Sequence, residues 1–123
     1  MADSSLIWVV DDDPAIRELL SFMVTGAGYD VDAFSSGAEV LAHSGKPPNA
    51  VLLDLMMPGL SGMEVLEKIK AMDSKIQVIL LTGHGATKDG IRGMQLGAFD
   101  YLIKPIDIDE LIEKLNEAAK HMA

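Results

Sequence analysis

Acidic side chains mark the positions in this sequence that could do chemistry. The run Asp11–Asp13 ends one apolar segment, and Asp54 lies near the end of another. Carboxylates that are brought together repel one another at neutral pH, so such a group needs a compensating cation. Oxygen ligands favour a hard ion, which predicts Mg²⁺, with Mn²⁺ as an alternative. A buried aspartate such as Asp54 can also act as a nucleophile and form an acyl phosphate.

Three other residues follow apolar runs and could bind a phosphoryl group. Lys104 supplies a positive charge, and Pro105 after it allows a cis peptide bond that would fix the direction of the lysine. Thr82 offers a hydroxyl group, and Gly83 lets its backbone N–H approach an anion. Each has an ordinary alternative: a solvated surface lysine, a β-branched residue that ends a strand, and a glycine in a turn.

The same acidic residues could instead cap helices. Asp13 precedes Pro14 and an apolar pattern with helical period, so we interpret Asp13 as the N-cap. One cap suffices, which leaves Asp11 and Asp12 for another role. A loop of about seven residues separates Asp54 from the next helical pattern, which argues against a capping role for Asp54.

Apolar runs alternate with helix-period segments along the whole chain. The predicted strands are 6–10, 29–34, 50–55, 76–82 and 99–103. The first predicted helix starts after Asp13 and ends near Gly26. The other four predicted helices cover 36–42, about 61–72, 87–96 and 107–122. Strand–helix repetition implies right-handed crossovers and a doubly wound parallel α/β sheet covered on both faces. Because ligands bind beyond the carboxyl ends of such strands, the acidic residues, Thr82 and Lys104 are expected to converge.

Composition limits the classes of function. The 123 residues suit a single domain, 1–123, and the net charge of −9 opposes binding to nucleic acid or to an anionic membrane. The absence of cysteine excludes disulfides and thiol nucleophiles. The amino-terminal segment lacks the basic region and apolar core of a signal peptide, so a cytoplasmic location is expected. His43, His84 and His121 are interpreted as surface residues and Trp8 as a core residue, and Met72 is expected to face inward from its helix.

Taken in order, these motifs resemble the receiver domain of bacterial two-component response regulators. They are the acidic pair after the first strand, DLMMPGLSG from Asp54 to Gly62, LTG at 81–83 and YLIKP at 101–105. The run from Asp54 to Gly62 fits the family pattern D-x-x-M-P-x-x-x-G without a gap, and the resemblance covers about Leu6 to Ala119. The resemblance implies a flavodoxin-like (βα)5 fold with strand order 2-1-3-4-5.

The resemblance also implies a role for each matching residue. Asp54 would be the phosphoacceptor, and Lys104 would pair with it or with its phosphoryl group. Asp12 would bind Mg²⁺ directly, Asp11 mainly through water, and the backbone carbonyl of Met56 would be a further ligand. The backbones of Met56 and Gly83 would bind the phosphoryl group. Thr82 would bond a phosphoryl oxygen, and Tyr101 would change rotamer with it, which repacks the face of the fourth helix, fifth strand and fifth helix.

The resemblance implies partners as well. The donor would be a phosphohistidine of a sensor histidine kinase or histidine phosphotransfer protein, and the output a downstream protein or a covalently linked domain. A receiver of this kind catalyses only its own phosphorylation and dephosphorylation. A homodimer is possible, although the fifth helix lacks the basic residues that pair across the dimer face in one large subfamily. Family members tune the lifetime of the phosphoryl group at the positions of Met56 and His84, and Met56 suggests slow self-dephosphorylation.

Two glycines in the predicted helix at 87–96 allow two interpretations. Gly90 and Gly93 each cost up to about 1 kcal/mol of helix stability relative to alanine, which suggests that this helix is the moving element. Alternatively, the glycines allow the helix to pack closely on the sheet.

Three other functions compete with this interpretation. A phosphohydrolase of the haloacid-dehalogenase type uses an Asp two residues after the nucleophile, where this chain has Met56. A flavin-binding flavodoxin needs a phosphate loop after the first strand, where three aspartates would repel the phosphate. An interaction module that works without phosphorylation would lack a key residue, and none is missing here.

Overall fold

The computed structural model describes residues 5–57, 59, 61–83 and 87–120. Within them, strands and helices alternate from end to end. The strands are β1 (Leu6–Val10), β2 (Asp30–Phe34), β3 (Ala50–Asp54), β4 (Gln77–Thr82) and β5 (Asp100–Ile103). The helices are α1 (Pro14–Gly26), α2 (Gly37–Ala42), α3 (Gly62–Met72), α4 (Thr87–Gln95) and α5 (Ile108–Ala119). The predicted elements are confirmed, with boundaries that differ by at most three residues.

All five strands form one parallel sheet in the order β2-β1-β3-β4-β5, as expected. The register brings the carboxyl ends together: Val10 pairs with Phe34 and with Leu53, and Asp54 pairs with Leu81. The residues that follow β1, β3, β4 and β5 therefore share one edge of the sheet.

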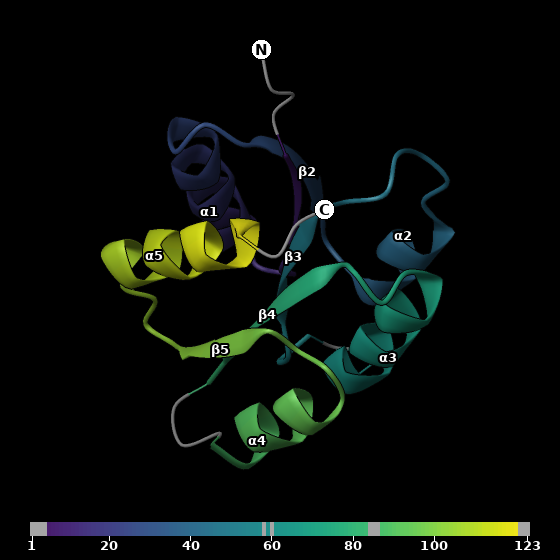
Figure 1. Cartoon of the computed structure of the whole chain (residues 1–123). Helices are drawn as coiled ribbons and strands as arrows, with labels where there is room; N and C mark the ends of the chain where they lie inside the picture. Colours follow the sequence, from purple (N-terminus) through teal and green to yellow (C-terminus); the bar gives the residue numbers. More distant parts are fainter. Residues whose placement is uncertain (1–4, 58, 60, 84–86, 121–123) are drawn as a thin grey trace.

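Helices cover both faces of the sheet, with α1 and α5 on one side and α2, α3 and α4 on the other (Figure 1). Alternate residues of each strand supply the two cores. Ile7 and Val9 pack in the core with α1 and α5, whereas Trp8 and Val10 pack in the core with α2 and α3. Burial of both faces explains why β1, β3 and β4 are continuous apolar runs without a polar alternation.

Side-chain caps set where the helices begin. The Asp13 carboxylate accepts the N–H groups of Ala15 at 2.9 Å and Ile16 at 3.3 Å, which confirms that Asp13 is the N-cap of α1. Ser61 caps α3 in the same way. Asp54 is thus not needed as a helix cap, as the sequence indicated.

Two expectations about side chains are wrong. Met72, predicted to face inward, is 51% exposed, because it lies in the last turn of α3, beyond the core position of Ile69. His43, predicted to lie at the surface, turns its ring onto Trp8 and Phe34, with ring centroids 5.4 and 5.1 Å away. Its Nε2 atom is buried without a hydrogen-bond partner in the described part of the chain. His43 follows the last residue of α2, where helical periodicity no longer indicates which way a side chain points.

The glycines of α4 lie against other side chains. A Cβ atom at Gly93 would be 2.0 Å from Leu80 Cδ1, and one at Gly90 would be 2.8 Å from the Tyr101 ring. This geometry favours the close-packing interpretation of both glycines. The hypothesis that α4 is the moving element stays a prediction.

Within the described residues, no helix combines the length and apolar character that a membrane span requires. The predicted end of the last helix at Met122, like His84 and His121, falls outside these residues.

Candidate functional site

Three carboxylates meet at the carboxyl edge of the sheet. Asp11 follows β1 and is fully buried, and Asp54 ends the neighbouring strand β3 with 1% of its surface exposed. Asp12 is exposed beside them. One oxygen atom from each of the three lies within 4.8 Å of the others. The structure therefore brings the three predicted metal ligands together.

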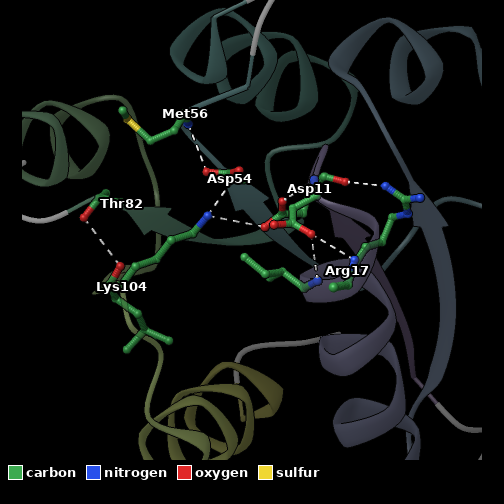
Figure 2. A network of polar contacts seen from close by, with 10 residues as sticks. Asp11, Arg17, Asp54, Met56, Thr82 and Lys104 are labelled. Carbon is green, nitrogen blue, oxygen red and sulfur yellow. Dashed lines mark hydrogen bonds and ion pairs between the residues drawn. The ribbon is translucent and has the colours of Figure 1, made fainter.

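Asp54 is held in place by its own loop. Its Oδ1 accepts the backbone N–H of Met56 at 2.9 Å (Figure 2). Beyond the loop, the first turn of α3 lies directly against the end of β3: a Cβ at Gly62 would be 2.8 Å from Leu55 Cα and 3.3 Å from the Asp54 carbonyl oxygen. Only glycine allows this approach, which gives a physical reason for the glycine at the end of the D-x-x-M-P-x-x-x-G run.

Lys104 links two of the carboxylates. It follows β5, where its N–H donates to the Thr82 carbonyl at 2.8 Å. Its Nζ lies 3.3 Å from Asp54 Oδ2 and 3.5 Å from Asp11 Oδ2 (Figure 2). The Lys104–Pro105 peptide bond is cis, the isomer that the sequence allowed. Lys104 is therefore the ion-pair partner of the cluster and not a solvated surface lysine.

Burial dominates the electrostatics of Asp11. Loss of solvent raises the pKa of its carboxyl group above the ordinary 3.8, and the nearby Asp54 charge raises it further. The Asp13 N–H, which donates to Asp11 Oδ1 at 2.9 Å, and the Lys104 ammonium both oppose this rise in pKa. The charged form of Asp11 is thus only partly compensated by the protein.

The donor set fits a hard divalent cation. The cluster contains only oxygen atoms, and its exposed member, Asp12, leaves it open to solvent. Asp11, Asp12 and Asp54 could hold such an ion. The Met56 carbonyl belongs to the loop that follows Asp54. In the described part of the chain, Lys104 is the one lysine paired with these carboxylates, which are therefore expected to gain from a second cation.

The predicted switch residues lie on the β4–β5 side of the site. Thr82 is fully buried, and its hydroxyl donates to the Leu102 carbonyl over a long 3.5 Å. The half-buried Tyr101 ring lies against Gly90 of α4. Gly83 is half-buried, and the exposed Met56 side chain lies across it, 3.8 Å from the position of a Cβ there. Thr82 thus ends the strand next to the one that carries Asp54, and Tyr101 contacts α4.

Sequence reasoning missed Arg17. This residue lies in the second turn of α1, and its Nη1 atom donates to the Asp11 carbonyl at 2.8 Å (Figure 2). The four-residue spacing from the cap Asp13 is the only signal that could have placed it near the cluster, and that spacing is common on helices.

Comparison with known proteins places these features in a family. Residues 7–116 match the family model described as the response regulator receiver domain. The chain is 42% identical over 117 residues to the DNA-binding transcriptional regulator NtrC of Escherichia coli, which covers 94% of this chain and 25% of that protein. The chain thus spans about a quarter of the length of this curated relative.

Solved structures are similar over nearly the whole chain. A response regulator receiver domain protein from Clostridium thermocellum has a TM-score of 0.87 and 34% identity, with 94% of each chain covered. A CheY-like receiver domain protein from Methanospirillum hungatei has a TM-score of 0.90 and 28% identity, with 97% of each chain covered.

Proposed function

Because the chain belongs to the response regulator receiver domain family, we propose that Asp54 accepts a phosphoryl group from a phosphohistidine of a sensor histidine kinase or phosphotransfer protein. The chain is the receiver domain of a two-component response regulator, with an acidic cluster of Asp11, Asp12 and Asp54. It is not an enzyme that turns over an external substrate.

The observation that carries the proposal is the position of Lys104 between Asp54 and Asp11. A phosphoryl group on Asp54 would bring negative oxygens to the place where the Lys104 ammonium lies. Phosphoryl transfer depends mainly on positioning and charge neutralisation, which Lys104 supplies. In the proposed step, a carboxylate oxygen of Asp54 attacks phosphorus. The P–N bond breaks, its electron pair stays on the leaving imidazole, and Asp54 becomes an acyl phosphate.

Asp11, Asp12, Asp54 and the Met56 carbonyl would hold Mg²⁺, or Mn²⁺ in its place. When bound, the cation would neutralise charge on the phosphoryl oxygens. The backbone N–H groups of Met56 and Gly83 would then bind those oxygens. Met56 N–H already donates to Asp54 Oδ1, so it needs only a small change of acceptor.

The proposed output is a rearrangement of the face formed by α4, β5 and α5. The Thr82 hydroxyl would turn from Leu102 toward a phosphoryl oxygen, and Tyr101 would move into the space that this opens. Exposed apolar side chains on this face, Ile91, Met94 and Ile103, support a protein contact there. The contact would be a downstream protein, a linked output domain or a second copy of the chain.

The cellular setting follows from the same proposal. The curated relative NtrC is a longer regulator, and this chain matches about a quarter of its length. We place the reaction in the cytoplasm, where the kinase would be phosphorylated by ATP. The net charge of −9 disfavours direct contact with nucleic acid or with an anionic membrane.

Intact mass after treatment with acetyl phosphate and Mg²⁺ tests the proposal. The wild type should gain one phosphoryl group, and Asp54→Ala should gain none. Asp109→Ala, which removes an exposed carboxylate from the first turn of α5, is the matched control and should gain the group. A stable phosphoryl gain that survives Asp54→Ala would exclude Asp54 as the acceptor.

A further inference from the structure

The backbone of Asp11 is held more tightly than its place at a strand end requires. Its N–H donates to the Phe34 carbonyl at 3.1 Å, which continues the pairing of β1 with β2. Its Oδ1 accepts the Asp13 N–H, and its Oδ2 faces Lys104. The carbonyl oxygen is the remaining polar atom, and the Arg17 guanidinium binds it at 2.8 Å. Arg17 and Lys104 thus approach Asp11 from α1 and from the end of β5, as Figure 2 shows.

This contact fixes the peptide plane between Asp11 and Asp12. A peptide unit is planar, so an acceptor bond to the Asp11 carbonyl also sets the direction of the Asp12 N–H and the position of the Asp12 Cα. Among the described residues, nothing donates to the Asp12 carboxylate, which is exposed. The direction of the Asp12 side chain therefore depends on the backbone, and Arg17 binds the Asp11–Asp12 peptide unit that sets it.

The position of Arg17 is itself well determined. Its backbone N–H donates to the Asp13 carbonyl at 2.9 Å, within the helix that the Asp13 side chain caps. The Arg17 charge also acts on Glu39, whose carboxylate accepts hydrogen bonds from the N–H and hydroxyl of Ser35. Those bonds are the main reason for the lowered pKa of Glu39, and the Arg17 charge lowers it further. The capped helix thus fixes the backbone of Arg17, and the Asp11 carbonyl fixes its guanidinium group.

We propose that Arg17 is a positioning residue for the divalent cation: it holds the Asp11–Asp12 peptide so that both carboxylates face the metal position. This inference rests on the proposed metal site. It makes a prediction opposite in sign to simple electrostatics. A positive charge near a cation site weakens cation binding, so removing it should tighten Mg²⁺ binding if Coulomb repulsion dominated. If positioning dominates, removing Arg17 weakens Mg²⁺ binding.

Mg²⁺ titration of the full chain, followed by backbone amide NMR, separates the two effects. Arg17→Met keeps most of the aliphatic stem and loses both the donor and the charge. We expect its Mg²⁺ dissociation constant to rise about tenfold, the size usual for groups that orient metal ligands. Arg17→Lys should recover part of the loss, because a lysine offers a donor without the planar fork. Lys68→Met removes an exposed charge from α3 and should leave Mg²⁺ affinity unchanged.

Phosphorylation by acetyl phosphate gives a second measurement. In Arg17→Met, the Mg²⁺ concentration for half-maximal rate should rise by the same factor, while the rate at saturating Mg²⁺ stays near that of the wild type. An unchanged or lower dissociation constant in Arg17→Met would overturn the positioning role. If Arg17→Met does not fold, Arg17→Lys provides the test. A wild-type Mg²⁺ affinity in Arg17→Lys would show that the planar guanidinium group is not needed, which contradicts the positioning role. A wild type that does not bind Mg²⁺ at Asp11, Asp12 and Asp54 would instead contradict the proposed function.

Discussion

Lys104 lies within ion-pair distance of two carboxylates that come from different strands. Both carboxylates are buried, and within the described residues no other side-chain cation is recorded in contact with them. Removing one partner of a buried charged group usually destabilises a protein, because the remaining charge is left uncompensated. The contribution of Lys104 to stability should therefore depend on whether another cation is present.

We predict that Lys104→Met lowers the free energy of unfolding by about 1–3 kcal/mol in the absence of divalent cations. Millimolar Mg²⁺ should recover most of this loss, since it compensates the same carboxylates. Urea unfolding with and without Mg²⁺, followed by the fluorescence of Trp8, measures the effect. Equal losses with and without Mg²⁺ would contradict the shared role, and Lys68→Met controls for loss of a charge.

Met56 lies beside Asp54 with 61% of its surface exposed. Its thioether side chain cannot orient an attacking water as an amide side chain can. We predict that Met56→Asn shortens the phosphoryl lifetime severalfold, because the amide would hold a water near phosphorus. Loss of the phosphoryl mass with time measures the lifetime. A lifetime in Met56→Asn equal to or longer than that of the wild type would show that this position does not control hydrolysis.

Residue types alone predicted much of the site. Asp11, Asp12, Asp54 and Lys104 follow strands directly, so the parallel sheet brings them together once the strands are recognised. Arg17 was not predictable in the same way, because its contact is made by a long side chain to a backbone carbonyl. No residue type marks such an acceptor in a sequence.

At the scale of the elements, α4 gives a test with opposite signs for the two interpretations of its glycines. Gly93 lies so close to Leu80 that an added Cβ would overlap a fully buried side chain. A glycine that only weakened the helix would become more favourable by up to about 1 kcal/mol on change to alanine.

We therefore predict that Gly93→Ala lowers the free energy of unfolding by about 1–3 kcal/mol through overpacking. Leu80→Ala combined with Gly93→Ala should cost less than the sum of the two single changes, because the smaller side chain leaves room for the new methyl group. Urea unfolding of the three variants measures this. Stabilisation by Gly93→Ala would restore the interpretation of α4 as a helix weakened by glycine.

Gly90 is expected to behave differently, because its neighbour is able to move. The Tyr101 ring that lies against it is only half-buried. We predict that Gly90→Ala displaces the Tyr101 ring without phosphorylation, visible as changed ring chemical shifts in NMR. Asp89→Ala, at the neighbouring exposed position, should leave those shifts unchanged. Unchanged ring shifts in Gly90→Ala would mean that the helix moves instead of the ring.

Element types and order were predictable because helix and strand periods differ clearly along this chain. The direction of individual side chains at element ends was not. His43 and Met72 show why: each lies at or just beyond the last turn of a helix, where loop geometry and not periodicity decides which side is buried.

At the scale of the whole molecule, the net charge of −9 is spread over only 123 residues. Self-repulsion of like charges favours the expanded state, and salt screens it. We predict that raising NaCl from 0.01 to 0.5 M stabilises the cation-free protein by about 1 kcal/mol, measured by urea unfolding. A loss of stability would instead mean that ion pairs such as Lys114–Asp100, 2.7 Å apart, outweigh the repulsion.

The parallel α/β class followed from the strand–helix pattern because such connections allow few topologies, and the strand order followed from the resemblance to receiver domains. The partner did not follow, because recognition depends on exposed side chains whose arrangement carries no periodic pattern.

The long hydrogen bond of Thr82 has a consequence for how readily this molecule can respond. A hydroxyl held at 3.5 Å from its acceptor contributes little to stability, although Thr82 lies in the core. Rotating it toward a new acceptor beside Asp54 therefore removes almost nothing from the resting fold. If Asp54 is phosphorylated as proposed, this hydroxyl would therefore present little energetic resistance to the change of partner.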